Sequence, residues 1–280
     1  MIITMPYIAE ETDDFAVVFK PPKMHSTSTE DLTQRHEEHK EKFISGTLLG
    51  WYQEQAGNIT GVSLMHRLDY ETHGLVLIAK NEKSFCFFKD LQDKGGFVKE
   101  YSAKVMRNEE REERKEKREK EKRRMWSEEC EERSVCLNGF PAHPEILESS
   151  PCFEKPFIIE SYFRPFGPGR KQVRPVIEDG KKHKEVAKDK GGFYRTEIVS
   201  LFDNIITARI KRGFRHQIRC HLYWIGFAIL NDPIYFNTVE SSGIDIQGTD
   251  NTEILALRAH ALFFTDPASG KKRECRIEGI

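Results

Sequence analysis

The stretch from Met65 to Lys80 constrains the fold of this chain more than any other part of it. It opens with charged and hydroxyl side chains and ends in an uninterrupted apolar run from Leu75 to Ala79. A short apolar run that follows a glycine is typical of a buried strand. Asp69 is therefore predicted to lie in a turn just before a buried strand, where a rigid scaffold can hold a reactive carboxylate steady. By itself, the pattern also fits an ordinary polar turn with a local ion pair.

The composition sets wide limits on the class of protein. The chain has 280 residues with 44 basic and 45 acidic side chains, and its formal net charge is −1. That length allows one large domain or two small ones, and a near-zero net charge neither favours nor excludes nucleic acid as a partner. The six cysteines are scattered without a C-x-x-C pair, so neither a disulfide framework nor a zinc site is predicted. A cluster of Cys130, Cys136, His143 and Cys152 fits no standard metal-ligand spacing.

Targeting signals are not evident in the sequence. The first residues lack a basic region followed by a long apolar region, so no signal peptide is predicted. No apolar run approaches the roughly 20 residues that a membrane-spanning helix needs. We therefore expect a soluble protein that acts in the cytoplasm.

Apolar periodicity predicts the secondary structure along the chain. Asn81 is a candidate N-cap for a helix that ends near Gly95-Gly96, and Phe85, Phe88 and Leu91 form its buried side. Alternating or continuous apolar residues predict strands at Phe15–Phe19, Phe97–Met106, Phe157–Phe163, Thr196–Leu201 and Asn204–Ile210, and a late helix or strand at Leu255–Phe264.

Two segments are dominated by charge. Between Arg107 and Arg133 there are eleven basic and eleven acidic residues with almost no apolar anchor. Several acid-before-base pairs spaced i,i+4 favour a solvated helix, which we interpret as an insertion over about residues 107–146. The second segment, Arg164 to Lys190, holds nine basic against four acidic residues. This net-positive segment either meets phosphate groups or is an ordinary surface loop.

The stretch from Arg212 to Phe227 is the second organised part of the chain. A helix that begins at His216 would turn its apolar side chains toward the core. Arg215 and Arg219, one turn apart, would share another edge of that helix. With His216 and Gln217 beside them, the two arginines are predicted to form a cluster that faces an anion.

The residues around Asp69 resemble a known catalytic motif. RluA-type RNA pseudouridine synthases carry H-R-L-D-x-x-T-S-G, and this chain is similar at His66-Arg67-Leu68-Asp69, Thr72 and Gly74. Two departures are expected to alter contacts with RNA: His73 stands where the family usually has Ser, and Phe214-Arg215 where Arg-Thr is common. Further stretches resemble the same family in the same order, namely Phe15–Pro22, Val98–Val105, His216–Tyr235 and Leu257–Pro267.

This resemblance implies a fold, a reaction and a substrate. The fold would be α+β: a single pseudouridine synthase catalytic domain over residues 1–280, with a central, mainly antiparallel mixed sheet flanked by helices and the charged insertion within it. The reaction would isomerise uridine to pseudouridine at specific sites in structured RNA, either ribosomal or transfer RNA. Neither a metal nor another cofactor is implied, and a monomer is expected.

The resemblance also implies catalytic roles. Asp69 would be the catalytic residue, and Arg219 would pair with it and keep it ionised. Tyr101 would pack on the uracil of a flipped-out uridine and later take the C5 proton. The route that Asp69 takes stays open between attack at C1′, addition at C6 and removal of the 2′ proton.

Contacts with RNA are implied for a second set of residues. Arg67 would fill the place that the flipped uridine leaves, and Arg215, His216 and Gln217 would bind RNA. The main alternative is a non-catalytic RNA-binding protein on the same fold, against which the intact catalytic residues count. A kinase interpretation of the H-R-L-D stretch fails, because the chain lacks a glycine-rich phosphate loop and a D-F-G motif.

Overall fold

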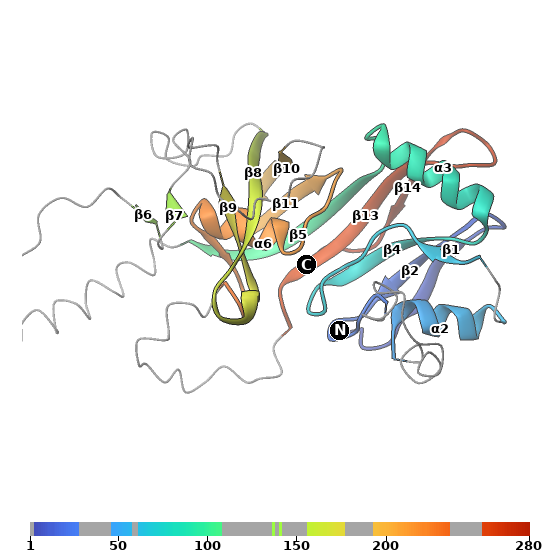
Figure 1. Cartoon of the computed structure of the whole chain (residues 1–280), viewed down its shortest axis with the longest axis horizontal. Coiled ribbons are helices and arrows are strands. Elements are labelled where there is room, and N and C mark those ends of the chain that lie inside the picture. Colours follow the sequence, from blue (N-terminus) through green and yellow to red (C-terminus); the bar gives the residue numbers. More distant parts are fainter. Residues whose placement is uncertain are drawn as a thin grey trace, which may run out of the picture. The chain divides into compact units, whose positions relative to one another are not determined.

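The chain folds into two compact units (Figure 1). The computed structural model describes residues 3–27, 46–57, 61–107, 136–137, 140–141, 156–176, 193–235 and 254–280. The first unit contains Met1–Ala103, Thr207–Gly213 and Ile254–Ile280, and the second contains Lys104–Ile206 and Phe214–Glu253. Strand β5 (Val98–Arg107) begins in the first unit and ends in the second.

The first unit is built on a mixed sheet. Its strands lie in the order β1-β2-β4-β13-β5, with β3 beside β4 and β14 beside β13. Neighbouring strands are antiparallel except β4 and β13, which run parallel. Helices α2 (Leu48–Gln55) and α3 (Glu82–Asp93) belong to the same unit. The other bounds are β1 Tyr7–Glu11, β2 Phe15–Lys20, β3 Ser63–Leu64, β4 His73–Ala79, β13 Leu257–Thr265 and β14 Lys272–Arg276.

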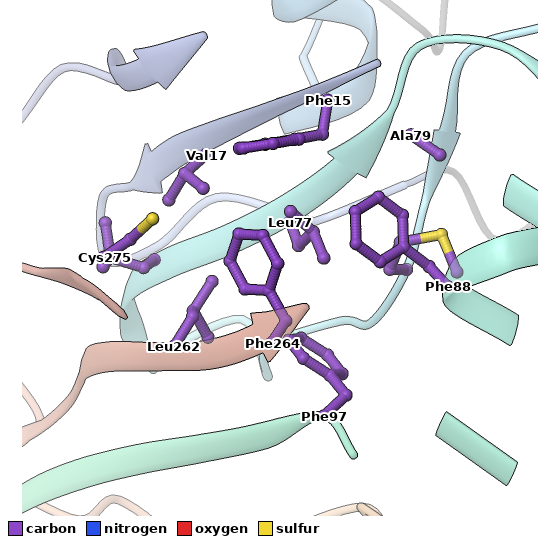
Figure 2. Packing of buried hydrophobic residues seen from close by; sticks show 11 residues of the cluster. Phe15, Val17, Leu77, Ala79, Phe88, Phe97, Leu262, Phe264 and Cys275 are labelled. Atoms are coloured by element: carbon purple, nitrogen blue, oxygen red, sulfur yellow. The ribbon is translucent and has the colours of Figure 1, made fainter. Parts of the chain in front are cut away.

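The core of the first unit lies around β2 and β4, which are buried along their whole lengths. Figure 2 shows Phe15, Leu77, Phe88 and Phe264 converging from β2, β4, α3 and β13. The ring of Phe88 meets that of Phe15 edge to face at 6.1 Å and that of Phe264 at 5.6 Å. Such edge-to-face pairs add to the free energy gained from burial alone. The buried strand predicted at the central motif is thus confirmed, and it begins earlier than predicted, at His73.

Helix α3 has the start and the buried side that its sequence predicts. Asn81 is the N-cap: its side chain accepts from the N–H of Ser84, and the Ser84 side chain accepts in return from the N–H of Asn81. This capping box satisfies two N–H groups that a helix start otherwise leaves open. Phe88 is buried, and Phe85 and Leu91 pack partly buried against the same core.

Gly74 permits the close approach of β4 and β13. It pairs with Ala259 across the parallel register and has a φ of 127°. A Cβ atom at this position would lie 2.2 Å from the carbonyl oxygen of Ala259, far inside van der Waals contact. Only glycine therefore allows the two strands to pair immediately after the Asp69 turn.

The second unit contains an antiparallel group of strands and a buried helix. Strand β8 pairs with β10 on one side and β9 on the other. The end of β5 pairs with β12, and helix α6 is buried along its whole length. The bounds are β8 Phe157–Phe166, η3 Pro168–Arg170, β9 Gln172–Val176, β10 Tyr194–Phe202, α6 Gln217–Trp224 and β12 Phe227–Ile229, besides the short pair β6 Cys136–Leu137 and β7 Phe140–Pro141. Strand β11 (Ile205–Ile210) begins in the second unit and ends in the first.

The predicted α+β architecture, mixed and mainly antiparallel with few helices, is confirmed. The late element predicted as a helix or a strand is strand β13. Apart from four short-strand residues and the end of β5, the charged insertion predicted at about 107–146 lies outside the described residues. A single catalytic domain over residues 1–280 stays a prediction. None of the helices in the described part of the chain has the length and apolar character needed to cross a membrane.

Candidate active site

Asp69 lies in a turn that leads directly into β4. Its carbonyl oxygen accepts from the N–H of Thr72 at 3.1 Å, which closes the turn. Leu68 and Thr72, on either side, are buried, whereas Asp69 is half-buried. The neighbours therefore anchor the turn inside the unit, while the carboxylate remains within reach of a substrate.

The chain after β2 holds this turn from the other side. The Ser26 hydroxyl donates to the carbonyl of Leu68 at 3.0 Å and accepts from the N–H of the same residue at 3.1 Å. The N–H of Lys23 donates to the carbonyl of Tyr70 at 2.9 Å. The ring of Tyr70 also contacts that of His25, with 4.7 Å between centroids. Asp69 thus lies between two residues whose backbones are bonded to a second loop.

Lys20 is a fully buried lysine beneath the same turn. Its ammonium group donates to the carbonyls of Pro21 at 3.0 Å, Met24 at 2.7 Å and Tyr70 at 3.2 Å. Three acceptors match the three N–H bonds that a lysine carries. Burial lowers the pKa of Lys20 to about 7, against the opposing effect of the Asp69 and Glu71 carboxylates. Lys20 therefore joins the end of β2 to the Asp69 turn and places a titratable charge near its carboxylate.

The sequence analysis did not single out Lys20 or Ser26 as site residues. The available signal for Lys20 was a lysine directly after the apolar run Phe15–Phe19, in a strand that is buried throughout. A charged residue at such a position needs partners. No comparable signal exists for Ser26, because its partner Leu68 lies 42 residues away in the sequence.

Tyr101 lies on β5 in the same unit as Asp69 and is 5% exposed. Burial first, and the negative charge of Asp69 second, raise the pKa of the Tyr101 phenol above its usual range. The structure thus brings together two of the three predicted catalytic residues. A phenol with a raised pKa stays protonated near neutral pH, so it can donate a hydrogen bond or offer a stacking surface.

The first two residues of the motif, His66 and Arg67, differ in their surroundings. His66 Nε2 accepts from the N–H of Leu77 at 3.2 Å, so the ring ties the motif to β4. Burial and, to a smaller extent, the positive charge of Lys99 lower the pKa of His66 well below its usual value. His66 is therefore neutral and structural. Arg67 is exposed, as an RNA-contacting residue must be, and its predicted role stays a prediction.

His73 does not contribute an exposed group at the motif. It begins β4 and is buried, and its ring lies edge-on to that of Phe19 at 6.4 Å. Burial, reinforced by the positive charges of Arg258 and Lys20, lowers the pKa of His73 to about 3. The departure from serine therefore places a neutral ring in the interior, which does not support the altered contact with RNA expected from the sequence.

Arg219, the third predicted catalytic residue, lies on α6 in the second unit. Its Nε and Nη2 atoms donate to the two carboxylate oxygens of Asp232, both at 2.7 Å. The side chains are 2% and 0% exposed, so this is a buried bidentate ion pair. Asp232 also accepts from the N–H groups of Ile234 and Tyr235. The pairing of Arg219 with Asp69 would join the two units, and it stays a prediction.

The prediction that Arg215 and Arg219 share one helix edge is wrong. Arg215 precedes the helix, because His216 has a left-handed backbone with a φ of 57° and α6 begins at Gln217. The exposed Arg215 side chain donates instead to the carbonyls of Arg170 at 2.6 Å and Gln172 at 3.3 Å. The two arginines therefore have separate surroundings, one at the surface and one inside.

Gln217 and His216 are also tied into the second unit. Gln217 is 2% exposed; its amide nitrogen donates to the Arg195 carbonyl and the Thr196 hydroxyl, and its amide oxygen accepts from the N–H of Phe214. The amide is fully used inside the unit, which does not support the predicted contact of Gln217 with RNA. His216 is half-buried, with its ring edge-on to that of Tyr235 at 5.9 Å.

The described residues contain no group of three or more His, Cys, Asp or Glu side chains that could hold a metal ion. The side chains of the cluster considered from the sequence, Cys130, Cys136, His143 and Cys152, lie outside the described part of the chain. The Asp69 turn itself offers a half-buried carboxylate, with the buried Tyr101 phenol and the buried Lys20 ammonium group near it.

A family model for RNA pseudouridylate synthases matches residues 14–224, a range that includes Asp69, Tyr101 and Arg219 and extends over both units. The chain belongs to the RNA pseudouridylate synthase family. Members of this family are isomerases that modify RNA.

Two human pseudouridylate synthase domain proteins share the fold. The structure of human RNA pseudouridylate synthase domain containing 1 matches with a TM-score of 0.57 and 16% identity, over 98% of this chain and 83% of that one. Domain containing 4 matches with a TM-score of 0.53 and 16% identity, over 98% and 88%. An uncharacterized protein of Caenorhabditis elegans is 26% identical over 240 residues, 83% of this chain. The match spans 39% of that relative's length.

Proposed function

We propose that this chain is an active RNA pseudouridine synthase that converts uridine to pseudouridine in structured RNA, with Asp69 as the catalytic residue. The observation that carries the proposal is the Asp69 turn itself. Its half-buried carboxylate influences the buried phenol of Tyr101, and its backbone is bonded to Ser26 and Lys20. Catalytic groups need this kind of support from residues that are themselves held in place.

The reaction is an isomerisation, so nothing is added to or lost from the nucleoside. The bond between C1′ and N1 breaks, the uracil rotates, and a bond forms between C1′ and C5. The proton on C5 leaves, and N1 gains a proton. A carboxylate near the sugar and the base can assist by attack at C1′, by addition at C6 or by removal of the 2′ proton, and Asp69 is the residue proposed for this work.

Tyr101 contributes as a neutral group in this proposal. Its raised pKa favours the phenol over the phenolate, so it packs against the flipped uracil and donates through its hydroxyl. Before the Tyr101 hydroxyl can accept the C5 proton, it must give up its own proton. We therefore propose that Tyr101 relays a proton and does not act as a phenolate that is already present. Flipping the uridine costs a few kcal/mol, and Arg67 at the exposed side of the motif is proposed to fill the vacated place.

The second candidate is an RNA-binding protein on the same fold without chemistry. Affinity for RNA does not separate the two functions, because both require it. Formation of pseudouridine separates the two functions, because only the enzyme produces it. We therefore propose pseudouridine mapping of total RNA, by carbodiimide labelling and reverse transcription, from cells with and without the gene, which also names the RNA and decides between ribosomal and transfer RNA.

The decisive variant is Asp69→Ala, measured with the purified enzyme on the RNA that the mapping identifies. We expect product to fall below detection while the melting temperature and the RNA affinity remain close to those of the unmodified protein. Asp13→Ala is the matched control, because Asp13 is an exposed carboxylate of the same unit. Full turnover by folded Asp69→Ala enzyme would contradict the assignment of Asp69.

A further inference from the structure

Strands β8 and β9 form an antiparallel hairpin in the second unit (Figure 1). Successive residues of a strand point to opposite faces of the sheet. Phe163 and Val173 are buried, at 0% and 1% exposure. Arg164 and Arg174, the next residue along in each strand, are half-buried and belong to the other face. The open face of this hairpin therefore carries arginines where the closed face carries apolar side chains.

Arg164 and Arg174 lie directly opposite each other in the antiparallel register. Like charges in directly opposed cross-strand positions destabilise a sheet. No Asp or Glu occurs between residues 161 and 176 of the sequence, and Glu160, the carboxylate of β8, forms an ion pair with Arg195. Burial first, and the positive charge of Arg164 second, lower the pKa of Arg174, so the two charges repel each other. A pair of like charges kept in opposed positions despite this cost is expected to serve a function.

The guanidinium of Arg174 is also oriented by its surroundings. Its Cζ atom lies 3.1 Å from the centroid of the Phe166 ring. A guanidinium that stacks on an aromatic ring keeps its N–H groups in the guanidinium plane, directed outward at the ring's edge. Arginine in this arrangement binds a phosphate through two parallel hydrogen bonds. Phe166 therefore helps to present Arg174 to an anion.

The tip of the hairpin adds more positive charge. Arg170 and Lys171 are exposed there. Arg215 is bonded to the backbone of the same tip through the carbonyls of Arg170 and Gln172, which fixes a fifth cation beside it. A row of cations on one exposed element is the electrostatic footprint of a nucleic-acid backbone.

We propose that the open face and tip of the β8–β9 hairpin bind the phosphodiester backbone of the RNA substrate, with one phosphate held between Arg164 and Arg174. The inference rests on the proposed function insofar as RNA is the substrate, and it assigns the binding energy to residues other than those around Asp69. A bound phosphate replaces the repulsion between the two arginines with two attractions. The two arginines contact the RNA backbone and no base, so they position the RNA without selecting its sequence.

The test compares RNA binding by the intact chain and by a double variant, Arg164→Gln with Arg174→Gln. The probe is a fluorescein-labelled RNA hairpin with a uridine-rich loop, followed by anisotropy over a series of salt concentrations. We expect affinity to fall by roughly ten-fold or more. The slope of log affinity against log salt should decrease by about 0.7 to 0.9, the contribution of one neutralised phosphate. Lys83→Gln with Lys89→Gln, two exposed lysines of α3, removes the same charge elsewhere.

A second variant separates a binding role from a structural one. Arg170→Gln with Lys171→Gln changes only exposed side chains at the tip, so it should fold normally and also weaken binding. The single variant Arg164→Gln should keep or raise the melting temperature, because it removes a like-charge pair. A lowered melting temperature with unchanged RNA affinity would show that the arginines serve the fold, and it would overturn the proposal.

Turnover distinguishes this inference from the proposed function. With the RNA identified by mapping, the hairpin variants should raise KM more than they lower kcat. Normal product formation with unchanged KM and affinity in both double variants overturns the hairpin site and leaves the function intact. Hairpin-dependent RNA binding without any pseudouridine product overturns the function and leaves the hairpin site intact. An equal loss of affinity in the α3 control attributes binding to overall charge and also overturns the site.

Discussion

Lys20 in the first unit and Arg219 in the second are both buried long cations, and they are satisfied in opposite ways. In the first unit, the Lys20 ammonium donates to three neutral main-chain carbonyls, and its pKa falls to about 7. In the second unit, Arg219 forms a bidentate ion pair with the fully buried Asp232. A guanidinium keeps its charge at every physiological pH, whereas a buried ammonium group readily changes its protonation state.

This difference separates a permanent structural charge from a variable one. The Arg219–Asp232 pair fixes helix α6 to the turn that follows β12, because Asp232 also accepts from the N–H groups of Ile234 and Tyr235. Lys20 lies instead beside the Asp69 turn, and the Asp69 carboxylate opposes the fall in its pKa. The second unit thus holds a permanent charge within an ion pair, whereas the first keeps a titratable charge next to the proposed catalytic group.

The largest effect is expected from breaking the ion pair. Asp232→Ala leaves Arg219 buried without its carboxylate, and it should lower the free energy of unfolding by about 3–5 kcal/mol. Urea unfolding measures this loss. The double variant Asp232→Leu with Arg219→Met should be more stable than Asp232→Ala, because it buries no unpaired charge. A double variant less stable than the single one would contradict the view that the uncompensated charge causes the loss.

A pH series tests whether Lys20 makes the free energy of unfolding depend on pH. Its pKa is about 7 in the folded state and about 10.4 in an unfolded chain, so between these values the unfolded state binds more protons. The contribution of Lys20 to stability therefore rises with pH in this window, by at most about 1.4 kcal/mol per pH unit, and is lost as pH falls toward 7. The difference in free energy of unfolding between the intact chain and Lys20→Met, measured with urea, should increase across this window. Lys99, whose pKa burial lowers to about 8, contributes equally to both proteins. Parallel curves would contradict the lowered pKa.

The smallest effect on stability is expected for Lys20→Met at neutral pH. The variant loses three hydrogen bonds but no longer buries a charge, so the free energy of unfolding should change by only about 1 kcal/mol. Turnover should fall much more, because the Tyr70 carbonyl next to Asp69 loses a donor. Calorimetry and single-turnover kinetics on the same preparation test both halves. Unchanged turnover would show that Lys23 and Ser26 hold the turn without Lys20.

Local sequence signals predicted the elements well. The apolar run after Gly74, the Asn81 cap and the buried side of α3 all reappear in the structure, because each depends on residues close in sequence. Asp69 and Tyr101 lie in the same unit, and the charge of Asp69 contributes to the raised pKa of Tyr101. Both residues were named from the family resemblance and not from periodicity, and their catalytic roles stay predictions. Helix α2 also begins at a local signal, because the side chain of Thr47 accepts from the N–H of Gly50.

The hydrogen-bond partners of individual side chains could not be predicted in the same way. The sequence indicated an exposed edge shared by Arg215 and Arg219, yet the left-handed backbone at His216 delays the helix and separates them. Gln217 was predicted to bind RNA, and its amide is instead consumed by Arg195, Thr196 and Phe214. These outcomes depend on segments that meet only after folding.

The sequence by itself determined the family, the buried strand β4 and the position of a carboxylate just before it. Periodicity, glycine and capping act over a few residues, so they can be read without a fold. Only the tertiary structure decided that Lys20 supports the Asp69 turn, that Asp232 neutralises Arg219 and that Arg164 lies opposite Arg174. The physical reason is that a buried charge takes whichever donors and acceptors the packing brings to it, and packing is set by the whole chain.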